Sequence, residues 1–237
     1  MAIKLNLIGT LYRNKVYEYK TFMRSVVSFF EENPLFRGDG FPHIHSIKSR
    51  IKDPSHLEEK IKRKLKNGKN ITADNLFSEV TDIAGVRVFY LHQGQFSVIH
   101  KEIMSRIGND WKLFEEPKAY TWDPESEDFY KALHIKTEVN PRYYTSIHYV
   151  VMPNNETANI CCEIQVRTLF EEIWGEIDHA INYPNPTNDI GCKEQLRVLS
   201  KLVGTGTRLA DSIFRTHDEY LRIRKANKKR KDIRIKG

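Results

Sequence analysis

Basic side chains recur at close spacing around residue 50. Arg50 and Lys52 lie two positions apart, so in an extended strand they point to the same face. Lys60 and Lys64 follow one helical turn apart on a segment with a helical pattern, and they can reach the same place. Converging cations suit a triphosphate, which carries about four negative charges. A solvated basic helix face would show the same pattern, so this segment alone leaves both interpretations open.

Two acidic residues far apart in the chain stand in strand-like contexts. Asp82 comes just before a β-rich run, and Gly85 permits close approach of the backbone. Glu163, Gln165 and Arg167 alternate with apolar residues and so share one face of a strand. On separate strands of one sheet, Asp82 and Glu163 would supply two hard oxygen donors for a Mg²⁺ that also takes phosphate oxygens. Each segment also has an ordinary structural explanation. Asp82 and Gly85 could be cap and turn residues, and the Glu163 segment could be an edge strand with a solvent-exposed polar face.

An aromatic residue and a histidine lie between these two segments. Tyr144 stands at the start of a predicted strand, where its ring can stack on a purine. His148 follows four positions later on the same face and can reach a phosphate. A core aromatic beside a core histidine would give the same spacing.

Hydrophobic periodicity indicates the elements that must position these side chains. We expect helices at 12–32, from 54, at 95–107, at 169–181 and from 193 into the tail, and strands at 46–52, 86–91, 111–114, 147–152 and 160–166. Residues 115–129 are acidic and contain proline, so we predict a long surface loop there. On the last helix we expect Leu196, Leu199, Val203, Ala210 and Ile213 to face inward.

The order of these elements predicts an α/β protein with a mixed sheet layered by helices. The expected division is an N-terminal helical segment at 1–40, a central domain at 41–190, and a C-terminal helix with a basic tail at 191–237. No run of about 18 apolar residues occurs, which argues against a membrane span. The three cysteines form neither a disulfide framework nor a metal-ligand pattern, and they favour a cytoplasmic protein.

The net charge of +7 is concentrated in the tail. Nine lysines and arginines lie between Arg222 and Lys236 against one acid, Asp232, so this segment is strongly basic and the rest of the chain is nearly neutral. A run of this kind is most often a solvated chain end. Contact of this segment with RNA or another polyanion is the more specific interpretation.

Four motifs in this order resemble the synthetase domain of the RelA/SpoT family. They are Arg50-Ile51-Lys52 with the basic helix after it, Asp82-Ile83-Ala84-Gly85-Val86-Arg87, Tyr144 to His148, and Glu163-Ile164-Gln165-Val166-Arg167-Thr168. The resemblance covers about residues 45–185, and it is closest to the short members that lack a hydrolase half. It implies a nucleotidyltransferase-like sheet and transfer of the β,γ-diphosphate of ATP to a 3′-hydroxyl, with release of AMP.

The resemblance also implies roles for individual residues. The ATP site would comprise Arg50, Lys52, Lys60, Lys64 and Arg87. The two arginines would sandwich the adenine, an arrangement that cation–π attraction favours, and the three lysines would hold the phosphates. Asp82 and Glu163 would bind Mg²⁺, and Glu163 would take the proton of the attacking hydroxyl.

The acceptor site implied by the resemblance comprises Tyr144, His148, Gln165, Arg167 and Glu172. Tyr144 would stack on the base and His148 would contact the phosphates. Three positions depart from the family pattern: Tyr143 replaces a glycine, His56 replaces a serine, and Glu172 stands where some guanosine-specific members have asparagine. A carboxylate can still accept from guanine N–H groups, so guanine remains an acceptable base.

These residues are compatible with more than one function. The leading hypothesis is an alarmone synthetase that uses GDP or GTP and makes (p)ppGpp. The alternative keeps the chemistry but modifies the 3′ end of tRNA, as in toxin members of the family, with an antitoxin as partner; an adenine nucleotide is a further acceptor. A nucleotide-binding regulator without catalysis is a third class, against which the paired carboxylates argue. The last helix is long enough for a contact between subunits of a homo-oligomer.

Overall fold

The computed structural model describes residues 5–38, 41–155, 159–183 and 185–236, and within them it describes side chains from residue 8 to residue 227. Its elements are α1 (Leu5–Glu32), η1 (Pro34–Phe36), β1 (Ser46–Ile51), α2 (Pro54–Lys66), α3 (Leu76–Glu79), β2 (Ala84–Tyr90), η2 (Gln93–Gln95), α4 (Phe96–Ser105), β3 (Trp111–Thr121), α5 (Pro124–Ala132), β4 (Lys136–Val139), β5 (Ser146–Pro153), β6 (Cys162–Thr168), α6 (Leu169–Asn182) and α7 (Ile190–Lys236).

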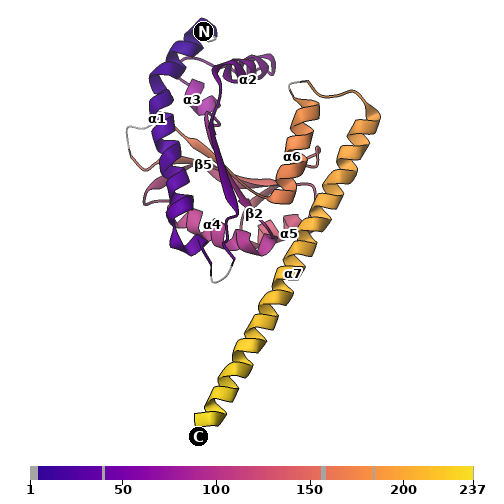
Figure 1. Ribbon diagram of the computed structural model, residues 1–237. Coiled ribbons are helices and arrows are strands. Elements are labelled where there is room, and N and C mark those ends of the chain that lie inside the picture. The colour runs from indigo at the N-terminus through magenta and orange to yellow at the C-terminus, as the bar shows by residue number, and fades with distance from the viewer. Residues whose placement is uncertain (1–4, 39–40, 156–158, 184, 237) are drawn as a thin grey trace.

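The six strands form one mixed sheet (Figure 1). The order of the strands in it is β1-β2-β6-β5-β3-β4. β2 pairs with β6 in parallel and β3 pairs with β4 in parallel, while the other neighbours are antiparallel. Helix α1 precedes the sheet in the chain and α7 follows it. The predicted α/β class, with a mixed sheet layered by helices and helical additions at both ends, is confirmed.

Alternation along the central strands gives the sheet an apolar and a polar face. Val86 of β2 and Ile164 of β6 are register partners, and both are fully buried. Their neighbours Arg87 and Gln165 are also register partners and point to the opposite side. The central strands therefore contribute the core on one face and the chemistry on the other.

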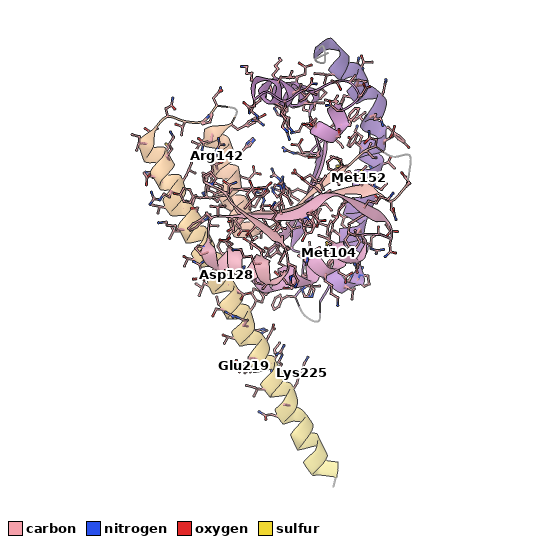
Figure 2. All side chains as sticks on the ribbon, turned by 180° about the vertical axis from the view of Figure 1, so that it is seen from behind. Met104, Asp128, Arg142, Met152, Glu219 and Lys225 are labelled. Atoms are coloured by element: carbon pink, nitrogen blue, oxygen red, sulfur yellow. The ribbon has the colours of Figure 1, made fainter. Side chains whose placement is uncertain are left out.

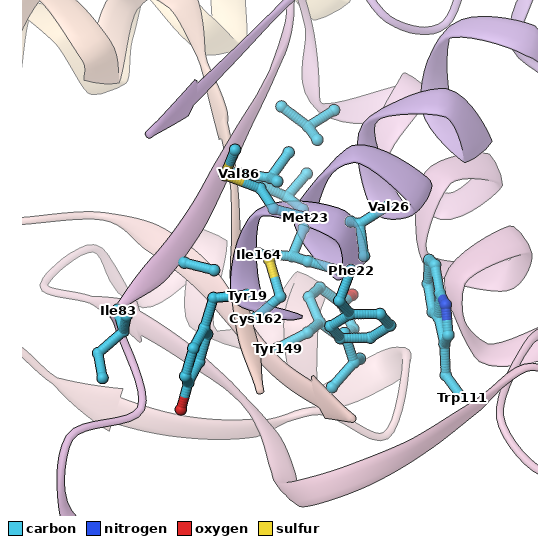
Figure 3. Close-up of a cluster of buried hydrophobic side chains, with 14 of the residues drawn as sticks. Tyr19, Phe22, Met23, Val26, Ile83, Val86, Trp111, Tyr149, Cys162 and Ile164 are labelled. Carbon is cyan, nitrogen blue, oxygen red and sulfur yellow. The ribbon is translucent and has the colours of Figure 1, made fainter. Parts of the chain in front are cut away.

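Helix α1 covers the apolar face. Tyr19 and Val26 of this helix are fully buried, and Figure 3 shows them with Phe22 and Met23 beside side chains of the central strands. Burying one side chain of this size stabilises a fold by about 1.5–3 kcal/mol. The packing of α1 leaves the polar face of the sheet uncovered by that helix.

The predicted loop at 115–129 is wrong, because these residues continue β3 to Thr121 and then form α5. Acidic residues and a proline are typical of loops, but in β3 the acids are exposed and the pairing with β5 shifts register between Glu115 and Lys118. A register shift of this kind tolerates a proline, because the ladder is already interrupted there. Asp123 then caps α5 by accepting a hydrogen bond from the backbone N–H of Ser126. The short edge strand β4 was not predicted.

The inward face of α7 was only partly predicted. Leu196 and Val203 are buried as expected, whereas Ile213 is 59% exposed. At that level of the helix Phe214 faces the body instead, with its ring stacked on His92 at 4.3 Å.

Helix α7 is held against the body by polar side chains that reach the starts of other helices. Thr207 lies 3.3 Å from Thr168, the N-cap residue of α6. Arg208 donates to Asp123, the N-cap residue of α5, at 2.8 Å. Asp211 accepts a hydrogen bond from a backbone N–H of η2 at 2.8 Å. The rings of Phe214 and His217 make the next contacts, with Phe41, and beyond them the helix extends away from the sheet (Figure 1).

Glu171 lies buried at this junction and makes folding stability dependent on pH. Burial raises the pKa of its carboxyl to about 7, against an ordinary value of 4.5. Between these two values the unfolded chain has released the proton that the folded chain still holds, so stability falls as the pH rises through that range. Glu171→Gln keeps an oxygen for the hydrogen bond from the Thr168 N–H and removes the titration.

We therefore expect Glu171→Gln to raise the melting temperature by roughly 5 °C at pH 8 and by much less at pH 5. Thermal unfolding followed by circular dichroism across this range measures the difference. An equal gain at both pH values would contradict the titration.

Among the described helices, none is both long enough and apolar enough to cross a lipid bilayer.

Candidate active site

A pocket of about 220 Å³ lies on the polar face of the sheet, between β1, β2, β6 and α6. Its lining comprises Lys48, Ser49, Arg50, Asp82, Gly85, Val86, Arg87, Glu163, Gln165, Glu176 and His179. The predicted residues among these come from three motifs that are far apart in sequence. The structure therefore brings Asp82 and Glu163 to one pocket, together with both arginines of the predicted ATP site.

Asp82 is enclosed by two lysines. Lys52, just after β1, lies 3.0 Å from one carboxylate oxygen, and Lys60 of α2 lies 2.8 Å from the other. The backbone N–H of Lys52 also donates to the carbonyl of Ile83, which ties the end of β1 to the start of β2. Burial favours the neutral form of Asp82, but the two ammonium groups outweigh it and lower the pKa of the carboxyl. The acid is therefore ionised at neutral pH.

Glu163 is held by one neighbour on each of its oxygens. His148 Nδ1 lies 3.2 Å from Oε1, and Gln165 Nε2 donates to Oε2 at 2.9 Å. Burial would raise the pKa of Glu163, but the hydrogen bond from His148 offsets it, and the pKa lies below its ordinary value. The Tyr144 hydroxyl lies 3.1 Å from His148 Nε2. The imidazole can therefore donate through Nδ1 to Glu163 and accept at Nε2 from the Tyr144 hydroxyl.

Lys64 contacts a different partner from the other two lysines. Its ammonium group donates to the backbone carbonyl of Glu79 at 2.6 Å and lies 3.9 Å from the Glu79 carboxylate. Burial lowers the pKa of this lysine. Lys52 and Lys60 thus flank Asp82 beside the pocket, whereas Lys64 is directed to α3.

Arg167 and Tyr144 pack on each other beside the pocket rather than lining it. The Arg167 guanidinium lies 5.7 Å from the centre of the Tyr144 ring and is 3% exposed. Room for this arginine comes from Gly175, where a Cβ atom would lie 2.8 Å from Arg167 Nη1. A larger residue at position 175 of α6 would clash with Arg167. Arg167 therefore packs against one face of the Tyr144 ring.

Glu172 joins three basic side chains. Oε1 lies 3.1 Å from Lys48 Nζ and 3.2 Å from Arg87 Nη1, and Oε2 lies 2.5 Å from Arg167 Nη2. The carboxylate is 5% exposed. Cations thus contact both carboxylate oxygens of Glu172 in this structure. These are the oxygens that would accept hydrogen bonds from the N–H groups of guanine.

Tyr143 adopts a backbone conformation that explains the glycine of the family pattern. Its φ is +64°, in the left-handed region that glycine enters without penalty. A tyrosine there costs roughly 1–2 kcal/mol, and its ring packs against Trp122 at 5.6 Å. Tyr143 therefore keeps the left-handed backbone of the turn that leads into β5.

Two Lys or Glu side chains of the pocket lining, Lys48 and Glu176, are not among the site residues predicted from the sequence. Lys48 stands two positions before Arg50 on the same strand face, so strict alternation along β1 would have found it. Glu176 lies one helical turn after Glu172 and contacts Arg87 at 2.7 Å. Helical spacing could suggest Glu176, but only the packing of α6 against β2 selects it.

A family model described as "Region found in RelA / SpoT proteins" matches residues 49–188. The chain belongs to the RelA/SpoT family. The matched region contains all four motifs, and every predicted site residue lies within it.

Two curated relatives come from Bacillus subtilis. The chain is 26% identical to GTP pyrophosphokinase YwaC over 183 residues, which cover 73% of this chain and 75% of that protein. It is 25% identical to GTP pyrophosphokinase YjbM over 217 residues, which cover 90% of this chain and 85% of that protein.

Solved structures confirm the fold. Small alarmone synthetase 1 from Bacillus subtilis, bound to its product pppGpp, superposes with a TM-score of 0.58 at 22% identity, covering 88% of this chain and 93% of that one. Small alarmone synthetase 2 from the same organism gives a TM-score of 0.61 at 19% identity, covering 88% and 98%.

Proposed function

We propose that this protein transfers the β,γ-diphosphate of ATP to the 3′-hydroxyl of GDP or GTP and releases AMP and (p)ppGpp. The observation that carries this proposal is the meeting of Asp82 and Glu163 in one pocket beside Arg50 and Arg87. The names of the curated relatives, both GTP pyrophosphokinases, support the reaction. Because its substrates are nucleotides of the cytoplasm, we also assign the protein to that compartment.

The adenine of ATP fits a slot between the two arginines. Arg50 pairs in register with Gly85, and Arg87 stands two positions further along β2 on the same face. Diagonal neighbours of this kind are about 7–8 Å apart, which accommodates one flat ring at contact distances of about 3.5–4 Å on each side. Gly85 has no side chain to fill the space. It forms the floor of the slot.

Lys52 and Lys60 are placed to bind the phosphates. Both ammonium groups lie beside Asp82 at the edge of the pocket, so they can compensate a triphosphate without moving far. In phosphoryl transfer most of the catalysis comes from positioning and charge compensation. We propose that Lys64, which contacts Glu79 here, adds to the positive potential rather than binding directly.

The two carboxylates fit a Mg²⁺ ion. Among the described residues there is no cluster of three or more His, Cys, Asp or Glu that could enclose a metal, and Mg²⁺ characteristically takes one or two carboxylates with substrate phosphates and water as its other ligands. Asp82 and Glu163 are both ionised oxygen donors on the same pocket. We propose that they hold the ion, which would offset charge on the transferred diphosphate.

Glu163 is the proposed general base. The 3′-oxygen of the acceptor forms a bond to the β-phosphorus, the bond from that phosphorus to the α,β-bridging oxygen breaks, and AMP leaves with the bridging oxygen. The hydroxyl proton passes to Glu163, which the His148 and Gln165 hydrogen bonds hold in a fixed orientation. In this scheme His148 orients the general base, Glu163, through Nδ1. Its predicted contact with the acceptor phosphates would use Nε2, which the Tyr144 hydroxyl contacts in this structure.

The acceptor base is proposed to stack on Tyr144. Arg167 covers one face of this ring, and the opposite face is assigned to the base. Gln165 lies on the same strand face as Glu163 and can donate to the acceptor ribose or phosphates. We propose that Glu172 acts indirectly, by fixing Lys48, Arg87 and Arg167 around this site.

The acceptor can be determined directly. Purified protein is incubated with Mg²⁺ and ATP labelled at the γ-phosphate, together with GDP, GTP, ATP or deacylated tRNA. We expect label in the guanine nucleotides with release of AMP. Label that appears only in RNA would replace the alarmone assignment by transfer to tRNA. If no AMP is released with any acceptor, the proposed enzymatic activity is rejected.

Transfer to the 3′ end of tRNA is the second candidate, favoured by the form of α7. The basic run from residue 222 onward lies on the part of this helix that extends away from the body, as Figure 2 shows for Glu219 and Lys225. Cations on a projecting helix can follow a nucleic-acid backbone. In this version of the function the arm would hold the tRNA, and an antitoxin would restrain the enzyme.

We propose that the chain also forms a homo-oligomer through α6 and α7. Most of the exposed large apolar side chains in the described structure lie on these two helices, among them Ile173, Ile177, Leu202 and Leu209. Large apolar side chains exposed together along helices are typical of protein interfaces. Light scattering coupled to gel filtration should give a mass above the 27.8 kDa of one chain; the monomer mass would contradict the proposal.

A further inference from the structure

The edge of the Arg87 guanidinium is held by two carboxylates from α6. Nη1 lies 3.2 Å from Glu172 Oε1 and 2.7 Å from Glu176 Oε1. The two glutamates stand one helical turn apart, so both reach the same group from one face of the helix. Two like charges at this spacing repel each other, and the shared guanidinium compensates that repulsion.

The orientation of a guanidinium plane determines what it can stack on. All N–H groups of arginine lie in the plane, so partners in hydrogen bonds hold the edge and leave the flat faces free. Arg87 is 24% exposed and lines the pocket. With two carboxylates on Nη1, rotation about the end of the side chain is restricted.

We infer that Glu176 is a positioning residue for ATP, which fixes the plane of Arg87 so that adenine can stack on it. The inference rests on the proposed function, in which Arg87 is one wall of the adenine slot. It assigns a role to a residue that touches Arg87 and not the reacting atoms.

Glu176 is the member of the pair whose role can be isolated. Glu172 is buried and compensates three cations, so its removal would leave uncompensated charge and disturb folding. Glu176 is 54% exposed and has an ion pair with Arg87. The hydrogen bond from Arg87 lowers the pKa of Glu176, so the pair persists through the neutral range. Loss of this carboxylate leaves the Glu172 contacts in place.

Electrostatics and positioning predict opposite effects on ATP binding. Removing a negative charge from the rim of a polyphosphate site raises its positive potential, so electrostatics alone predicts tighter binding. Positioning predicts weaker binding, because Arg87 can then rotate toward Glu172 and withdraw its face from the slot. The sign of the change in affinity therefore distinguishes the two.

The experiment measures binding of a non-hydrolysable ATP analogue and of inorganic tripolyphosphate by calorimetry, with wild-type protein, Glu176→Ala, Glu176→Gln and Glu176→Asp. We expect Glu176→Ala to weaken the ATP analogue about tenfold and to leave tripolyphosphate unchanged or slightly tighter. Glu176→Gln, which retains an acceptor oxygen, should lie between Ala and wild type. In turnover, the KM for ATP should rise with little change in kcat.

The matched control is Asp178→Asn. It removes the same charge from the same helix, at a side chain that accepts from Asn182 and does not line the pocket. Equal or tighter ATP binding by Glu176→Ala with an unchanged melting temperature would overturn the inference. An equal loss with Asp178→Asn would also overturn it, by showing a general effect of charge. If wild-type protein binds no ATP analogue at all, the proposed function fails instead.

Discussion

Glu163→Gln and Asp82→Asn are each expected to slow AMP release by at least about a hundredfold. Glutamine keeps the shape of Glu163 and can still accept from His148, but it has neither the basicity to take the hydroxyl proton nor the charge to hold a cation. Asparagine likewise keeps an oxygen beside Lys52 and Lys60. Chromatographic detection of AMP, with ATP and the preferred acceptor, measures the rate.

The matched control for these carboxylates is Glu79→Gln. Glu79 is also paired with a lysine, at 3.9 Å from Lys64, but it does not line the pocket. We expect Glu79→Gln to retain most of the activity. Wild-type rates from either pocket variant would reject the mechanism, since two acids brought into one pocket are its central element.

Gly85→Val is expected to abolish ATP binding without unfolding the protein. The φ of Gly85 lies outside the left-handed region, and a Cβ atom there would lie 4.0 Å from the nearest atom, Arg50 Cγ, which is ordinary contact. Valine is also a favourable strand residue. Its methyl groups would occupy the slot assigned to adenine, so we expect at least about a hundredfold weaker binding of the ATP analogue. The loss of affinity in Gly85→Ala should be smaller.

Calorimetry with the ATP analogue and tripolyphosphate provides the measurement. Tripolyphosphate binding should survive in Gly85→Val, because the valine occupies the place of the base and not that of the phosphates. Gly9→Ala in α1, where a Cβ atom would lie 3.6 Å from the nearest side chain, controls for glycine replacement. Full ATP affinity in Gly85→Val would show that the base binds elsewhere.

The alternation of polar and apolar residues was sufficient to predict the strands that carry the chemistry. Along β6, Glu163 and Gln165 alternate with Ile164 and Val166. Once the two apolar side chains are buried, Glu163 and Gln165 must lie on the opposite face of the sheet. The same argument places Arg50 on the polar face of β1. The acids could be assigned to one sheet for this reason, and the motif order then indicated the family.

The partners of these side chains, in contrast, depend on how distant segments pack in the fold. Lys60 and Lys64 are one turn apart on α2, yet one contacts Asp82 and the other Glu79. Glu172 was a departure from a pattern in the sequence, and in the fold it is the common partner of three cations. Such contacts join segments separated by up to 124 residues, and no local periodicity encodes them.

The same distinction explains the error at 115–129 and the exposed face of the last helix. Residues 115–121 have loop-like composition but become strand because β5 and β4 supply their hydrogen bonds from either side. Ile213 has the spacing of a core residue, but Phe214 is the one that meets the body. Local pattern determines which conformations a segment favours, and the burial available from distant segments selects among them.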